Sequence, residues 1–335
     1  MSKLQPAVLT LNYRLDGGIA SGWCDLSHSA SLVNRRFYRQ GTQWAVAGVS
    51  WQRSDSGTNS GALQTEILPT TWACSNAWHK AFANWRKQQN DALRESGQES
   101  IAAKFRDFKI FMDTAHYDDF IAAVGSDSSA KYNNTVMLPR NLVGTFATGE
   151  WAPSQVVLPN TASDGTSDVD PTEHYMHMVG TVGGASAADS LGLIAGYAFS
   201  RSVPQSPDPV VDPRVNDDTY NWMRNMFDDG NSDEEILENT QKNDELPYDQ
   251  LEYPNTGLNP APIGPGAGGG LQLHDESFIT GTTIGGRVNV PGFMAPCGLI
   301  KFTKSADLVS DQFDVQVHLV PGNHRGYLAS PMQDM

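Results

Sequence analysis

The feature that most constrains the fold is the alternation of residue types near the C-terminus, in residues 313–320. One face of this segment would carry Phe313, Val315, Val317 and Leu319, and the other Asp314, Gln316, His318 and Val320. Alternation with a period of two is typical of a strand with one buried face. Residues 297–303 indicate a second strand, and the polar residues 304–312 are expected to join the two as a hairpin. A long chain that ends in a hairpin is expected to be a β-sandwich.

Similar alternation predicts six more strands, at 8–15, 44–51, 108–112, 155–158, 174–179 and 193–200. One strong helix is predicted at 75–96, with Ser75 as its N-cap. Residues 19–42 look irregular. The chain is therefore predicted to be all-β: a single antiparallel eight-stranded jelly roll forming one domain over 1–335. Long insertions are expected at 52–106 and 201–296, in the CD and GH loops of that fold, the second with short helices near 217–227 and 233–242.

Composition narrows the class of protein. No run of about 18 apolar residues is present, so no membrane partner is expected, and the N-terminus lacks the apolar core of a signal peptide. Cys24, Cys74 and Cys297 follow no metal or disulfide spacing and are expected to be buried free thiols in a reducing compartment. The net charge of −15 is uneven: residues 1–150 hold 15 basic and 13 acidic side chains, and residues 151–335 hold 8 and 25. Only the first half is a candidate for contact with a polyanion.

Motifs for enzyme chemistry are weak, and neither an enzyme nor a cofactor or metal is predicted. His174 and His177 are three residues apart on a predicted strand, so they would face opposite sides. The stretch that begins at Asp229 lacks the Gly and Glu that a calcium loop of the EF-hand type needs. Two alternatives remain for Asp164, Asp168 and Asp170: a looser calcium site or a solvated acidic loop.

Residues 34–39 hold the densest basic and aromatic cluster in the chain. Cations that hold phosphates, interleaved with rings that stack on bases, are typical of single-stranded nucleic-acid binding. The predicted contact residues are Arg35, Arg36, Phe37, Tyr38 and Arg39. The alternative is a surface arginine cluster that is paired with carboxylates elsewhere.

A second group of large side chains lies in the acidic 201–296 insertion. On a helix beginning near Asp217 these side chains would form one continuous stripe, because residues four apart share a face. We expect this stripe to seal a contact between subunits, or else to pack on the sandwich of its own chain. The predicted interface residues are Tyr220, Trp222, Met223, Met226 and Phe227.

Several stretches of the second half resemble one viral family. GEWAPSQVVLPN (149–160), TEHYMHMVG (172–180), GYAFSRSVP (196–204), NDELPYD (243–249), PGFMAPCGLIKF (291–302) and VQVHLVPGNHRGYLASPM (315–332) look like segments of capsid proteins of small circular single-stranded DNA viruses. The likeness spans roughly residues 140–335 in consistent order, and APCGLIKF with VHLVPGNHRGYLA is its most specific part. No catalytic motif comes with it.

The resemblance implies a jelly-roll subunit that self-assembles into an icosahedral shell around a single-stranded DNA genome, located in the virion. Many such proteins begin with an Arg-rich arm, whereas this chain begins MSKLQPAVLT and runs into a predicted strand. The genome would then be held by folded surface, or packaged in another way. The open alternatives are a carbohydrate- or receptor-binding β-sandwich, with exposed Trp and Tyr as sugar platforms, and a cupin-like metalloenzyme.

Overall fold

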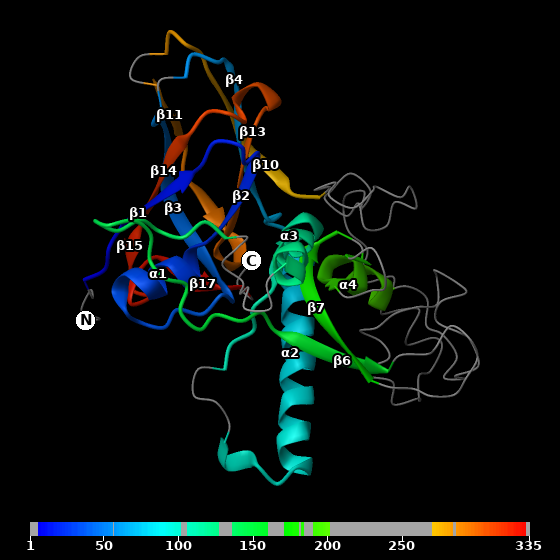
Figure 1. Cartoon of the computed structure of the whole chain (residues 1–335). Helices are drawn as coiled ribbons and strands as arrows, with labels where there is room; N and C mark the ends of the chain where they lie inside the picture. Colours follow the sequence, from blue (N-terminus) through cyan, green and yellow to red (C-terminus); the bar gives the residue numbers. More distant parts are fainter. Residues whose placement is uncertain are drawn as a thin grey trace.

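Two antiparallel sheets built from strands far apart in the sequence dominate the computed structural model of the chain (Figure 1). It describes residues 6–55, 57–101, 106–126, 136–159, 171–180, 182–183, 190–201, 270–283 and 286–332. The first sheet has the order β1 (Thr10–Leu15), β14 (Phe313–Leu319), β3 (Thr42–Arg53) and β11 (Arg287–Val290), and β12 (Phe293–Ala295) and β17 (Ala329–Pro331) also pair with β3. The second has the order β10 (Gln272–Ile279), β4 (Gly61–Ile67), β13 (Leu299–Lys304) and β2 (Ser21–Asp25).

The pairing of these strands follows a simple rule along the chain. In chain order, the eight strands of these two sheet orders are β1, β2, β3, β4, β10, β11, β13 and β14. The first of them pairs with the eighth (β1 with β14) and the second with the seventh (β2 with β13). The third pairs with the sixth (β3 with β11), and the fourth with the fifth (β4 with β10). The chain therefore forms one long antiparallel ribbon, which is closed by pairing of β14 with β3 and of β13 with β4.

One core lies between the two sheets. Phe313, Val315, Val317 and Leu319 of β14 are buried, as the alternation predicts. Trp51 of β3 meets Phe302 of β13 edge-on, with ring centroids 5.2 Å apart, which joins the two sheets. The predicted strands at 8–15, 44–51 and 313–320 are thus confirmed as β1, β3 and β14, because each buries one face in this core.

The predicted C-terminal hairpin is wrong. β13 lies in the second sheet and β14 in the first, so residues 304–312 cross between sheets. The short 3₁₀ helix Ala306–Leu308 lies in this crossing, and its buried Leu308 anchors it in the core. The start of the predicted strand at 297–303 also differs: Pro296–Gly298 is a 3₁₀ turn with Cys297 at φ 55°, and the strand begins at Leu299.

A third sheet, of mixed strand direction, lies in the long segment between β4 and β10. Its order is β5 (Phe111–Asp113), β7 (Pro171–Val179), β9 (Ser190–Gly192) and β8 (Val182–Gly183), with β6 (Gln155–Pro159) also on β7, and β7 is parallel to both β5 and β9. The helices α2 (Trp72–Glu95), α3 (Thr114–Ser126) and α4 (Leu193–Arg201) accompany it (Figure 1). Predicted strands 155–158 and 174–179 are therefore confirmed as strands, but they lie outside the sandwich, and only the end of 108–112 is a strand.

The prediction of a strand at 193–200 is wrong, because these residues form α4. Leu193 and Ile194 are buried in the core of this region, and the Tyr197 ring meets Trp72 of α2 edge-on at 6.3 Å. These positions share a helical face, and packing against α2 uses that face. A short apolar run does not by itself distinguish a buried strand from a buried helix.

The predicted insertions are also displaced. Only residues 54–60 separate β3 from β4, and β10, β11 and β12 all lie within 201–296. The long insertion runs instead from 68 to 271, between β4 and β10.

The predicted helix 75–96 is confirmed as α2, although Thr71, not Ser75, caps it by accepting a hydrogen bond from the Cys74 amide at 3.4 Å. Residues 19–42 are not irregular, since they contain β2 and α1 (Leu26–Asn34), and the helices expected near 217–227 and 233–242 lie outside the described residues.

A buried ion pair connects the sandwich to the mixed sheet. Lys301 of β13 places its Nζ 2.9 Å from Oδ2 of Asp113, at the end of β5, and 3.7 Å from Oε2 of Glu66 of β4. The other Asp113 oxygen accepts from Nε1 of Trp23 of β2 at 3.1 Å and from the backbone N–H of His116 at 2.8 Å. One carboxylate therefore ties β2 and β13 of the sandwich to β5 and α3.

All three cysteines are free and buried, as predicted. Burial raises the pKa of the Cys74 thiol to about 12, because a thiolate is poorly solvated there. Within the described part of the chain, no helix has the length and apolar character needed to cross a membrane.

Candidate nucleic-acid interface

The predicted contact residues begin at the C-terminal end of α1. Asp25 caps the start of this helix by accepting the backbone N–H of His28 at 3.0 Å. Arg35 ends the helix in the left-handed conformation, with φ 55° and ψ 38°. Its side chain is exposed, and its guanidinium carbon lies 5.9 Å from the centroid of the Phe146 ring.

Arg36 and Arg39 are held by backbone carbonyl groups. Nη1 of Arg36 donates to the carbonyl oxygen of Pro6 at 3.2 Å. Nη1 of Arg39 donates to the carbonyl oxygen of Arg106 at 2.8 Å, and the guanidinium carbon lies 5.8 Å from the centroid of the Phe37 ring. These bonds orient both guanidinium groups without neutralising their charge.

The two predicted aromatic residues have different environments. Phe37 is half-buried, with its ring centroid 6.1 Å from that of Trp151. Tyr38 has no exposed surface: its ring packs against Trp44 and Tyr327, and its hydroxyl donates to the carbonyl oxygen of Arg325 at 3.0 Å. The prediction that Tyr38 stacks on a base is therefore wrong, because core packing uses the whole ring.

The fold adds cations that sequence reasoning missed. Nη1 of Arg325 donates to the carbonyl oxygen of Phe37. Arg106 is the residue whose carbonyl oxygen accepts the hydrogen bond from Arg39, and Nη2 of Arg106 donates to Oδ1 of Asn90 at 2.8 Å. Lys109 lies 4.5 Å above the Trp151 ring, and burial lowers its pKa. Arg106 and Arg325 are isolated basic residues in the sequence, so no local pattern could have found them.

We refer to Arg35, Arg36, Arg39, Arg106 and Arg325 as the arginine cluster. Arg39, Arg106 and Arg325 form no salt bridge within 4 Å with any carboxylate of the described residues. Asp107 is an acidic neighbour of Arg39 and Lys109. Burial raises the pKa of the Asp107 carboxyl, and the positive charges of these two residues partly offset that rise. Oriented guanidinium groups that form no salt bridge among the described residues, next to the half-buried Phe37, suit a phosphate backbone.

The remaining motifs weighed in the sequence lie elsewhere. His177 is buried on β7, where its Nδ1 pairs with Oγ of Ser190, and His174 is also buried. No group of three or more His, Cys, Asp or Glu side chains that could hold a metal occurs among the residues described. Asp164, Asp168 and Asp170, the stretch from Asp229, and the interface residues Tyr220, Trp222, Met223, Met226 and Phe227 lie outside the described residues.

Comparisons with known proteins add no relative. A scan against protein-family models, a search of curated proteins and a search of solved structures each return no match for this chain.

Proposed function

We propose that this protein is a structural subunit that self-assembles into an icosahedral shell around a single-stranded DNA genome. On this proposal its sandwich is a jelly roll, the fold of many viral capsid subunits. The observation that carries the proposal is the strand order. An eight-strand antiparallel ribbon whose first and last strands pair, divided between a six-stranded and a four-stranded sheet, supports this assignment, because the strands of a jelly roll are wound in the same way.

The arginine cluster supports the nucleic-acid part of the proposal. The chain carries a net charge of −15, which disfavours contact with a polyanion over most of its surface. Against that background, Arg39, Arg106 and Arg325 come together from three separate segments and are oriented by carbonyl oxygens and an amide oxygen. Contact through phosphates would be independent of base sequence, as packaging of a genome requires.

The carbohydrate-binding alternative has less support. Sugar platforms need exposed aromatic faces, and this alternative rests on exposed Trp and Tyr side chains. Among the described residues every Trp and Tyr is buried or half-buried, and Trp72 is the one Trp that is not fully buried. A fold alone does not identify a function, so the proposal needs a direct test.

Electron microscopy of the purified full-length protein provides that test, combined with nuclease digestion and metal analysis. Closed, uniform shells that protect single-stranded DNA from nuclease would support the proposal. Discrete monomers or trimers that bind glycans would favour the lectin-like alternative. Stoichiometric bound metal without particles would favour the cupin-like alternative.

A further inference from the structure

Two exposed apolar patches lie on opposite sides of the sandwich. β1 and β2 end their sheets on one side, where the segment 136–140 joins them: the Met137 amide donates to the Trp23 carbonyl, and the Arg140 amide to the Asn12 carbonyl, both at 2.7 Å. β10 and β11 end the sheets on the other side. A partner that touches one side therefore leaves the other free.

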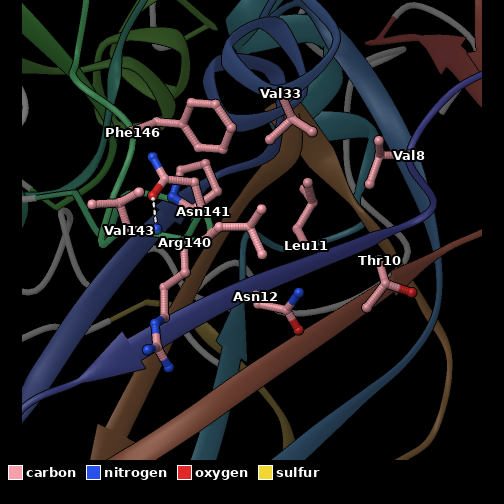
Figure 2. A pocket seen from close by; sticks show the side chains of 11 residues that line it. Val8, Thr10, Leu11, Asn12, Val33, Arg140, Asn141, Val143 and Phe146 are labelled. Carbon is pink, nitrogen blue, oxygen red and sulfur yellow. Dashed lines mark hydrogen bonds between the residues drawn. The ribbon is translucent and has the colours of Figure 1, made fainter.

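The first patch is a groove beside β1 with a volume of about 430 Å³. Leu11, Val33 and Phe146 converge on it, and the turn 140–145 forms its rim (Figure 2). At the tip of this turn Leu142 and Val143 are fully exposed, at 104% and 98%. We call the groove and this tip the β1-side patch.

Hydrogen bonds hold the backbone of the tip although its side chains lie in water. Oδ1 of Asn141 accepts the backbone N–H groups of Val143 at 2.9 Å and Gly144 at 2.7 Å, which fixes the turn. Arg140 anchors its base through Oδ1 of Asp314 at 3.1 Å. A fixed turn that presents two large apolar side chains to solvent is typical of a contact site.

The second patch is the outer edge of β10. This strand ends its sheet, so among the described residues no strand pairs with its outer edge. Leu273 and Phe278 are exposed at 51% and 69%, and Asp275 and Glu276 lie between them. An unpaired edge of this length is a ready template for another chain.

We propose that the β1-side patch of one copy receives the β10 edge of a second copy. Charge complementarity selects this occupant: Arg140 lines the apolar groove and shares the one carboxylate of Asp314 with Arg14, which leaves an excess positive charge there, whereas Asp275 and Glu276 accompany the apolar residues of β10. The two patches are different and lie on opposite sides, so the contact is heterologous and can repeat head to tail into a closed ring. This inference rests on the proposed shell, because closed shells contain such rings.

Disulfide trapping tests the contact. The three native cysteines are buried, so cysteines introduced by Val143→Cys and Phe278→Cys would be the reactive ones. Both positions are exposed, and neither substitution should disturb folding. A disulfide requires the two Cα atoms to lie within about 7 Å, which makes the cross-link a distance measurement.

The expected result is a cross-linked dimer when the two single variants are mixed and oxidised, with little dimer from either variant alone. Val143→Ser, which keeps the turn but removes the apolar tip, should reduce particle yield at least tenfold. A dimer of Val143→Cys with itself would instead show a two-fold contact between tips and overturn the proposal. An intramolecular disulfide in the doubly substituted chain would also overturn it, since the chain would then cover its own patch.

The two proposals fail in different ways. Closed shells in which the mixed cross-link never forms would overturn the β1-to-β10 contact and leave the shell intact. A mixed cross-link in open chains that never close would support the contact and overturn the shell. Monomers without any cross-link would overturn both.

Discussion

Asp25 is a carboxylate that has no exposed surface and no salt-bridge partner among the described residues. It accepts hydrogen bonds from the His28 amide and from Nε2 of Gln40, at 3.0 and 3.1 Å. Burial nevertheless raises its pKa to about 6, with Asp107 adding repulsion. The group therefore favours the folded state most when it is protonated.

The sign of the pH effect follows from this shift. The folded pKa of Asp25 lies above the unfolded value near 3.8, so folding takes up a proton between these values. Its contribution to stability is present below pH 4 and is lost as the pH rises through about 6. His28 acts in the opposite direction, because burial lowers its pKa to about 4 and its contribution is lost as the pH falls below 6.5.

Asp25→Asn isolates the first effect. Relative to the wild type, the variant should gain up to about 2 kcal/mol in free energy of unfolding between pH 4.5 and pH 7.5, because about 1.5 pKa units of the shift lie above pH 4.5. Urea denaturation at both pH values measures this difference. The exposed Asp307→Asn is the matched control. Parallel pH profiles for Asp25→Asn and the wild type would contradict the assignment.

The buried Lys301–Asp113 pair should be sensitive to loss of one partner. Their side chains are 9% and 1% exposed, so Lys301→Met leaves a buried carboxylate without its nearest cation. We expect a loss of about 3–5 kcal/mol, and partial recovery in Lys301→Met with Asp113→Asn. Urea denaturation of the wild type, the two single variants and the double variant measures the loss and the recovery. The exposed Arg94–Asp91 pair is the control, with an expected effect below about 1 kcal/mol. A double variant no more stable than Lys301→Met would argue against the pair.

At the scale of elements, Gln88 of α2 protects the edge of the mixed sheet. Its Nε2 donates to the Val157 carbonyl at 2.7 Å, and its Oε1 accepts the Val157 amide at 3.0 Å. The side-chain amide thus takes the place of a neighbouring strand at β6. Edge strands are commonly covered in this way against pairing with other chains.

Gln88→Ala should therefore leave the backbone amide and carbonyl of Val157 without these two hydrogen bonds. We expect faster hydrogen exchange of the Val157 amide and a stability loss of about 1 kcal/mol, since the lost bonds are partly exposed to water. Gln88→Glu keeps the acceptor for the Val157 amide and loses only the donor, so it should retain most of the protection. Equal exchange rates in Gln88→Ala and the wild type would show that the contact is not formed in solution.

Periodicity in the sequence predicts the elements that face one core. β1, β3, β14 and α2 are correct because each turns a periodic set of apolar side chains into a core. It misses β2, β4 and β10, and it misassigns α4, because these elements depend on partners distant in the chain. The arginine cluster shows the same limit: Arg35, Arg36 and Arg39 are adjacent in the sequence, whereas only the fold brings Arg106 and Arg325 beside them.

At the scale of the whole molecule, the arginine cluster should govern how much nucleic acid a particle holds. Arg39→Gln, Arg106→Gln and Arg325→Gln together remove three charges but keep side-chain donors for the carbonyl contacts. We expect particles of normal yield with at least threefold less protected DNA. The log–log salt slope of single-strand binding should flatten by about 0.7 per lost phosphate contact.

The matched control removes the same charge elsewhere. Lys87→Gln, Arg94→Gln and Arg287→Gln are three exposed positions outside the cluster. This variant should package as much DNA as the wild type. Equal losses in the two triple variants would attribute packaging to net charge and not to the cluster.

The most direct measurement is a cryo-electron microscopy reconstruction of particles assembled from the full-length chain. We predict a closed icosahedral shell of eight-stranded sandwiches, with the arginine cluster facing the interior against density for nucleic acid. A discrete oligomer, or a shell in which Arg39, Arg106 and Arg325 face outward, would contradict it.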